Sequence, residues 1–153
     1  MKARRALDVE ARSSSGYPEP FRARVLPREK RALGDAFGLT TIGVNLTTLF
    51  PGVESSMRHW HDREDELIYV LEGEVVLRTD AGDEILGPGM VAGFRAGDTD
   101  AHQLVNRSQQ PAVYLEISNR DAADRVGYAD VDMACAQDAS GRYVFTHRDG
   151  TPY

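Results

Sequence analysis

Cysteine is nearly absent from this sequence of 153 residues, since Cys135 is the only one. No disulfide can therefore form within the chain, which is typical of proteins that fold in a reducing compartment, and we expect a cytoplasmic protein. The sequence also lacks any apolar run of about 18 residues, the minimum for a membrane-spanning helix. The basic residues near its start are not followed by the apolar segment of a secretory signal, so we expect neither secretion nor a membrane.

Basic residues are too few for a typical nucleic-acid-binding protein. The 18 lysines and arginines are outnumbered by 24 aspartates and glutamates, and the net charge is −6. No basic patch is visible beyond the N-terminal stretch, so nucleic acid is not an expected partner. The sequence also shows no glycine-rich phosphate loop and no Ser-His-Asp arrangement, which argues against the nucleotide-binding and serine-hydrolase classes.

Turn-forming residues, by contrast, are abundant, with 14 glycines and 7 prolines. Turn signals such as Pro51-Gly52 and Pro88-Gly89 recur every 8–12 residues or so, the rhythm of a sandwich or barrel. Between the turns lie segments rich in β-branched and apolar residues. These segments are 39–50, 66–71, 74–79 and 113–117. The length suits one domain, and we predict an all-β fold.

The chain divides into three parts by composition. Residues 1–37 form an irregular arm, in which a short helical turn is predicted at 28–33 between Pro27 and Gly34. Residues 38–118 form the β-barrel. Residues 119–153 form a polar tail that packs on the barrel or on a partner subunit, with a hairpin predicted around 138–141.

Histidine is the residue type that indicates chemistry, and only four are present. His59 and His61 alternate in a segment expected to be extended, so both imidazoles point to the same face. Glu66 follows after a short turn and shares its strand parity with two apolar residues, which indicates an inward face. His102 lies further along the chain and can approach from another strand.

Three imidazoles and one carboxylate are a suitable ligand set for a divalent transition metal ion such as Zn, Fe, Mn or Ni. They suit Ca²⁺ and Mg²⁺ poorly. Four protein ligands leave an octahedral ion two open positions, where a substrate or O₂ can bind. The alternative is that His59 and His61 have no role and that the acidic residues 62–65 form a solvated loop.

The spacing of these residues resembles the first motif of the cupin superfamily, G-x5,6-H-x-H-x3,4-E-x6-G. It is matched in full by Gly52, His59, His61, Glu66 and Gly73. The second motif, G-x5-P-x-G-x2-H-x3-N, is matched with two departures. Arg95 replaces the proline, and four residues instead of two separate Gly97 from the histidine; the matching positions are Gly89, Gly97, His102 and Asn106.

The resemblance covers residues 40–118, and the ending at 147–153 is similar to that of a group of small bacterial cupins. It implies a double-stranded β-helix, also called a jelly-roll or cupin barrel, that holds one metal ion inside one mouth. The implied ligands are His59, His61, Glu66 and His102.

The remaining candidates for chemistry are weaker. Tyr114 and Glu116 are candidate general bases because they lie on a predicted barrel strand. Arg95 is a candidate partner for a substrate carboxylate or phosphate near the mouth, whereas Arg78 is expected to form a surface salt bridge. The catalytic residues therefore stay undefined.

Parity sends Tyr69 and Leu71 to the outer face of their strand, and such an apolar face favours a homodimer. We expect the protein to bind a small oxygen-containing molecule at the metal and to act as a dioxygenase, isomerase or lyase. The alternative is a non-catalytic protein that binds or senses a small molecule such as a sugar. A sugar phosphate would require a basic cluster in the mouth, for which only Arg95 is visible.

Overall fold

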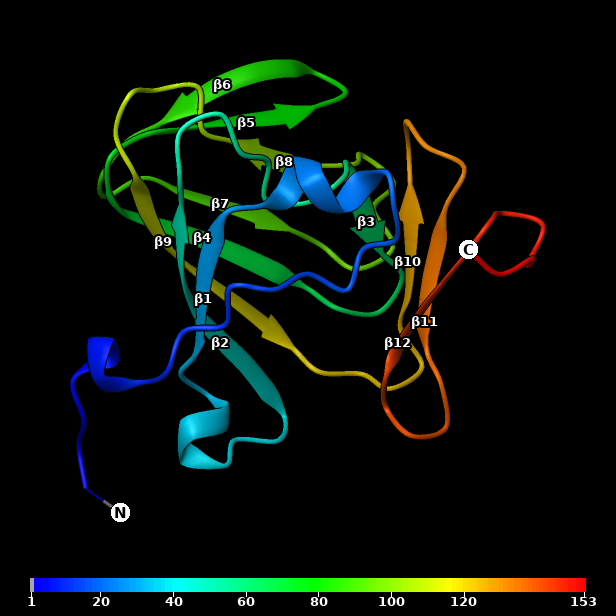
Figure 1. The fold of residues 1–153 in the computed structure, drawn as a ribbon, viewed down its shortest axis with the longest axis horizontal. Coiled ribbons are helices and arrows are strands. Elements are labelled where there is room, and N and C mark those ends of the chain that lie inside the picture. The colour runs from blue at the N-terminus through cyan, green and yellow to red at the C-terminus, as the bar shows by residue number, and fades with distance from the viewer. Residues whose placement is uncertain (1) are drawn as a thin grey trace.

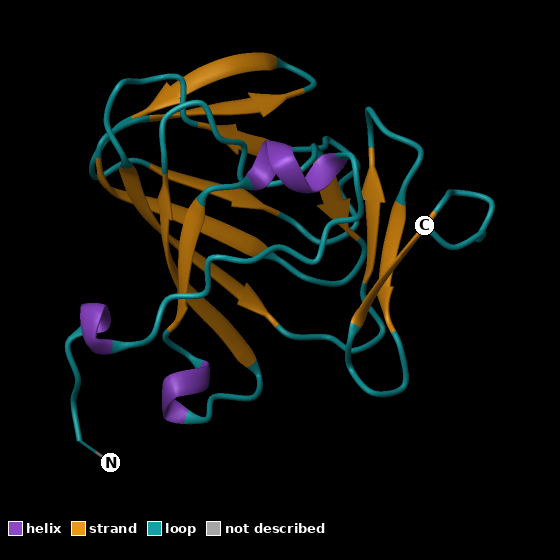
Figure 2. Ribbon diagram, in the orientation of Figure 1, coloured by secondary structure: helices purple, strands orange, loops and turns teal. Residues whose placement is uncertain are grey.

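The computed structural model describes residues 2–153 and is built almost entirely of β-strands (Figures 1 and 2). Its helical segments are three short 3₁₀ turns, η1 (Ala6–Asp8), η2 (Phe21–Val25) and η3 (Asp35–Phe37). The predicted all-β class is thus confirmed. Within the described residues, no helix is long and apolar enough to cross a membrane.

The larger sheet is antiparallel. Its strands, in spatial order, are β1 (Arg28–Ala32), β2 (Ile42–Leu49), β9 (Ala112–Asn119), β4 (Glu66–Glu72) and β7 (Val91–Phe94). On β4, Ile68 and Val70 are buried, while Leu67 and Tyr69 are exposed. This alternation confirms the inward parity predicted from the sequence.

Two smaller antiparallel sheets complete the fold. One orders β6 (Gly82–Leu86), β5 (Val75–Thr79) and β8 (Gln103–Val105), and the other orders β12 (Tyr143–Thr146), β11 (Ala134–Gln137), β10 (Arg125–Tyr128) and β3 (His59–His61). They meet at an isolated bridge in which His59 and His102 exchange both backbone hydrogen bonds, at 3.0 and 2.9 Å. The bridge fixes two histidines side by side before any side chain is considered.

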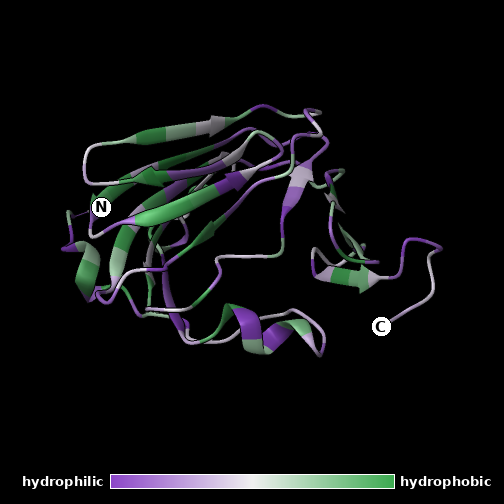
Figure 3. Cartoon of the chain, turned by 90° about the horizontal axis from the view of Figure 1, so that it is seen from above, coloured by the Kyte–Doolittle hydropathy of each residue, from purple (hydrophilic) through white to green (hydrophobic). Residues whose placement is uncertain are grey.

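Apolar side chains form two buried clusters. One lies inside the barrel and includes Leu49, Ile68 and Tyr114, while the other joins the N-terminal arm to the tail through Tyr17 and Tyr128. Figure 3 shows hydrophobic stretches on several strands and hydrophilic residues in many of the connecting loops. Arm and tail are therefore packed together as part of one structure.

The predicted helical turn at 28–33 is wrong, because residues 28–32 form β1 on the edge of β2. An open strand edge presents unpaired backbone groups, and pairing along β2 satisfies them better than an isolated turn would. Arg12 extends the pattern by exchanging backbone hydrogen bonds of 2.9 and 3.0 Å with Lys30. The predicted hairpin is present, since β11 pairs with β12 across the turn at 138–141.

Candidate metal centre

The short strand β3 carries two histidines on one face of the sheet. His59 and His61 alternate with Trp60, whose ring packs over Gly127 of the neighbouring strand β10. A Cβ atom at Gly127 would lie 2.2 Å from Trp60 Cζ2, so the ring fits only because that residue is glycine. The indole thus packs against the tail strand, while both imidazoles line a cavity between the sheets.

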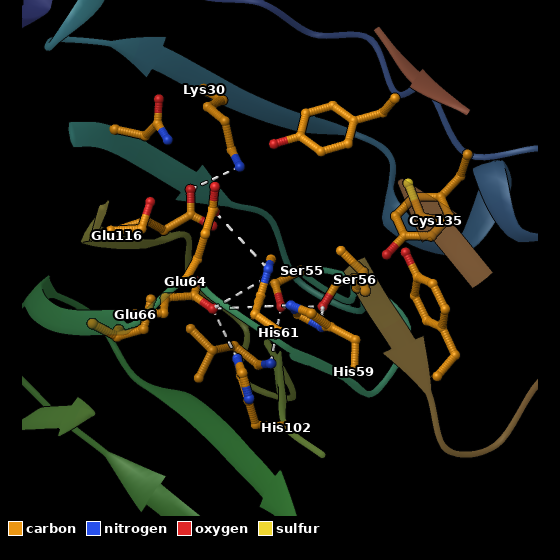
Figure 4. Close-up of a pocket in the computed structure, with 18 of the residues that line it drawn as sticks. Lys30, Ser55, Ser56, His59, His61, Glu64, Glu66, His102, Glu116 and Cys135 are labelled. Atoms are coloured by element: carbon orange, nitrogen blue, oxygen red, sulfur yellow. Dashed lines mark hydrogen bonds and ion pairs between the residues drawn. The ribbon is translucent and has the colours of Figure 1, made fainter. Parts of the chain in front are cut away.

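Glu66, at the start of β4, is the point on which the histidines converge (Figure 4). Its Oε2 atom lies 2.9 Å from His102 Nε2, 3.9 Å from His59 Nε2 and 4.0 Å from His61 Nε2. Protein ligands lie about 2.0–2.2 Å from a bound Zn²⁺, so two ligands of one ion are at most about 4.4 Å apart. Each of the three distances to Glu66 lies within that limit, and His59, His61 and Glu66 form a group whose ligand atoms all lie within 4.8 Å of one another. His102 adjoins this group through its contact with Glu66.

The other ring nitrogens explain why Nε2 faces the centre in two of the histidines. His59 Nδ1 lies 3.0 Å from the carbonyl oxygen of Met57, and His61 Nδ1 lies 2.6 Å from Oδ2 of Asp124. A carbonyl and a carboxylate only accept hydrogen bonds, so Nδ1 carries the proton in both rings. The lone pair is left on Nε2, where a metal ion requires it.

His102 is held differently. Its ring stacks on Phe94, with a centroid separation of 3.5 Å and an interplanar angle of 3°. Its Nδ1 atom is buried and has no hydrogen-bond partner among the described residues. The ring of His102 is therefore held by its packing on Phe94 and by the backbone bridge to His59, and not by a hydrogen bond at Nδ1.

The electrostatics of the cluster suit a cation. Burial above all, together with the neighbouring His102 and His61, lowers the pKa of His59 to about 3, so the imidazole is neutral. Burial by itself would raise the pKa of Glu66, but the hydrogen bond from His102 and the three imidazoles outweigh it and hold the pKa at about 2. At neutral pH His59 is therefore neutral and Glu66 is ionised, the forms in which these two side chains bind a metal ion.

The four side chains line a cavity of about 270 Å³ between the sheets. Its wall includes residues from all three predicted parts of the chain: Arg28 and Lys30 from the arm, Asn45, Glu116 and Ser118 from the barrel, and Tyr128, Cys135, Tyr143 and Phe145 from the tail. Arm and tail therefore shape the space in which a ligand would bind.

The three candidates for catalysis lie in different places. Glu116 lines the cavity, where its Oε2 atom forms an ion pair with Lys30 Nζ at 2.7 Å and accepts a hydrogen bond from Thr47 Oγ1 at 3.0 Å. Tyr114 lies in the apolar core, 1% exposed and outside the cavity wall, and burial raises the pKa of its hydroxyl well above the usual value. Arg95 is exposed after β7 and lines depressions outside this cavity.

Four residues near the site were missed by the sequence analysis: Arg28, Lys30, Glu64 and Asp124. The solvated loop considered for residues 62–65 is wrong for Glu64, which is only 7% exposed and accepts a hydrogen bond from the backbone of Asp121. Burial raises the pKa of Glu64. The neighbouring residues Asp62, Arg63 and Asp65 are charged and exposed, so no local signal distinguished Glu64 from them.

The inner wall of this β-barrel brings three histidines and a glutamate together, and these four residues form a candidate metal centre. The family model for the cupin domain matches residues 45–118. A sugar phosphate isomerase of the cupin superfamily from Silicibacter pomeroyi DSS-3 is 44% identical, covering 96% of this chain and 94% of its own with a TM-score of 0.91. The chain therefore belongs to the cupin superfamily, as the motifs predicted.

Two further solved structures share a lower sequence identity with this chain. A putative sugar phosphate isomerase from Acidithiobacillus ferrooxidans is 29% identical, covering 82% of this chain and 80% of its own, with a TM-score of 0.73. A polyketide cyclase from Streptomyces resistomycificus is 24% identical over 79% of this chain and 80% of its own, with a TM-score of 0.66, and shares the fold. Among curated proteins, none matches the chain significantly.

Proposed function

We propose that the protein is a metal-dependent isomerase of a small sugar phosphate. The observation that carries this proposal is the cavity itself, in which the candidate metal ligands share one wall with the Glu116–Lys30 pair. The similarity to the sugar phosphate isomerase from Silicibacter pomeroyi supports the same reaction class.

The ligands would be His59, His61, Glu66 and His102, and the ion one of Zn, Fe, Mn or Ni. When bound, such an ion acts as a Lewis acid that polarises a carbonyl or hydroxyl oxygen of the substrate. The protein contributes a neutral His59 and an ionised Glu66 at working pH.

Isomerisation of a hydroxycarbonyl compound moves one proton between neighbouring carbons and a second proton between the oxygens on those carbons, and it needs no second reactant. The chain must therefore supply a group that accepts the proton from one carbon and returns it to the next. Glu116 is the residue we assign to this role. The ion pair with Lys30 and the hydrogen bond from Thr47 both fall on Oε2, and Oε1 accepts no hydrogen bond from the described residues.

The test combines metal analysis with an activity assay. Protein purified without added metal is analysed for bound elements and assayed by NMR against a panel of aldose and ketose phosphates. Glu116→Gln should lower kcat by about 10²–10⁴-fold while metal content stays unchanged. Glu72→Gln, an exposed glutamate at the end of β4, is the matched control and should leave kcat unchanged.

Binding of the sugar phosphates without interconversion of any of them would contradict the proposed isomerase activity. That result would favour the alternative considered from the sequence, a non-catalytic protein that binds or senses a sugar. Full activity of the Glu116→Gln variant would leave the isomerase standing and remove Glu116 from the proton transfer.

A further inference from the structure

The edge strand β1 turns two cations into the cavity. Arg28 and Lys30 alternate with Glu29, and both line the same space as the candidate metal ligands. Both residues are partly buried, so water screens their charges less than it would at the surface. The two cations differ in how they are neutralised.

Lys30 is already paired, since its Nζ atom lies 2.7 Å from Glu116 Oε2. Arg28 is not: its Nη1 atom donates to the carbonyl oxygen of Ser55 at 2.6 Å, and no carboxylate in residues 2–153 lies within 4.0 Å of it. A guanidinium has five N–H donors, and a partly buried cation with only a neutral partner favours an anion beside it. Asn45 adds an amide in the cavity wall that makes no side-chain hydrogen bond with the described residues.

The register of the sheet places these cations away from Glu66. Arg28 pairs with Leu49, whose partner on β9 is Ala112, while Glu66 pairs with Ser118 at the other end of β9. Glu116 lies between those two positions on the same inward face. A ligand that reached from Arg28 to Glu66 would therefore pass Glu116.

We propose that Arg28, assisted by Lys30 and Asn45, binds the phosphate group of the substrate. The identity of the ligand, a sugar phosphate, rests on the proposed function. The position of its phosphate group rests on the Arg28 guanidinium, which has no carboxylate partner within the described residues. An arginine fork matches two phosphate oxygens, which makes the group a suitable anchor. The phosphate then sits away from the carboxylate of Glu66, and the sugar carbons lie beside Glu116.

The test measures binding of inorganic phosphate to the full-length protein by calorimetry. Arg28→Gln should weaken binding by about tenfold or more, because a charged hydrogen bond to the anion is lost. The matched control is Arg107→Gln, an arginine on the outer surface with a single ion pair to Asp83, which should bind phosphate as the wild type does. Arg28→Lys keeps the charge but loses the fork and should give an intermediate affinity.

Phosphate can also bind directly to a metal ion, so a variant that removes a ligand separates the two sites. His61→Ala should retain phosphate binding if Arg28 holds the anion. Loss of binding in His61→Ala together with wild-type binding in Arg28→Gln would overturn the proposal. If thermal melting shows that Arg28→Gln does not fold, phosphate binding is measured with Lys30→Met instead. Wild-type phosphate affinity in Lys30→Met would overturn the proposal.

The two proposals fail in different ways. Phosphate binding that depends on Arg28, in a protein that isomerises no sugar phosphate, would contradict the proposed function and support the anion site. Isomerase activity whose KM for the phosphorylated substrate is the same in wild type and Arg28→Gln would support the function and overturn the anion site.

Discussion

Replacing Asp124 with asparagine removes a negative charge from the hydrogen bond that orients His61, while the side chain keeps its size. Asp124 is 7% exposed, and its two oxygens accept hydrogen bonds from His61 Nδ1 at 2.6 Å and from the backbone of Arg63 at 2.7 Å. The carboxylate therefore fixes both the ring orientation and the tautomer that leaves Nε2 free for a metal ion.

The size of the effect follows from these contacts. A hydrogen bond to a charged group contributes about 1.5–3 kcal/mol, against about 0.5–1.5 kcal/mol for a neutral one. Asparagine offers one acceptor oxygen for these two donors, so its amide group would face either the His61 or the Arg63 N–H. Asp124→Asn should therefore weaken metal binding by about tenfold or more, within the range of about 10–100-fold seen for such partners of metal ligands. Asp124→Ala should reach the upper end, because His61 Nδ1 and the Arg63 N–H then lose their acceptor.

The assay is competition for the metal with a chelator of known affinity, with the visible spectrum of Co²⁺-loaded protein as a second readout of ligand geometry. Asp132→Asn is a close control, since Asp132 also accepts from a histidine Nδ1, that of His147 at 2.9 Å, and from a backbone N–H, but lies exposed on the tail. Wild-type affinity and an unchanged spectrum in Asp124→Asn would refute the orienting role.

Three further predictions concern the tail and the outer face. Burial raises the pKa of the Cys135 thiol from 9.0 to about 12, so at pH 8 alkylation should be roughly a thousandfold slower than for an ordinary thiol and should accelerate about tenfold per pH unit; fast labelling followed by mass spectrometry would contradict this. Gly127→Ala should lower the free energy of unfolding by about 1–3 kcal/mol in urea titrations, because its Cβ collides with the Trp60 ring, and an unchanged midpoint would show that the ring moves freely. Leu67 and Tyr69 are exposed on the outer face of β4, where we expect a second copy of the chain, so the double change to lysine should convert a dimer to a monomer in sedimentation experiments; a wild-type monomer would contradict the homodimer.

The parts of the site that could be predicted from the sequence are those with a short-range pattern. Alternation placed His59 and His61 on one face, and the parity of Ile68 and Val70 showed that Glu66 points inward. The cupin motifs indicated His102, although the turn before it is longer than the motif has. In the structure, the backbone bridge to His59 fixes the position of His102.

The missed residues have in common that their roles depend on distant partners. Arg28 and Lys30 lie in a strand with no apolar face, since the surface they cover is a polar cavity, and the flanking Pro27 and Gly34 favoured a helical turn. Asp124 reaches His61 across 63 residues of chain through the pairing of β10 with β3. No local spacing encodes such a contact.

Tyr114 illustrates the opposite error, because strand parity gives direction but not depth. It shares the inward face of β9 with Glu116, yet it lies two residues further into the barrel, where apolar side chains fill the interior. The same parity therefore leads to the cavity at one position and to the core at the other.

The central claim is tested most directly by a crystal structure of the protein as purified, with anomalous diffraction recorded across the absorption edge of the metal found in it. We predict a single anomalous peak about 2.0–2.3 Å from Nε2 of His59, His61 and His102 and from a carboxylate oxygen of Glu66. A peak elsewhere, or a His102 ring turned out of the coordination shell, would contradict the assignment of these four residues as one metal site.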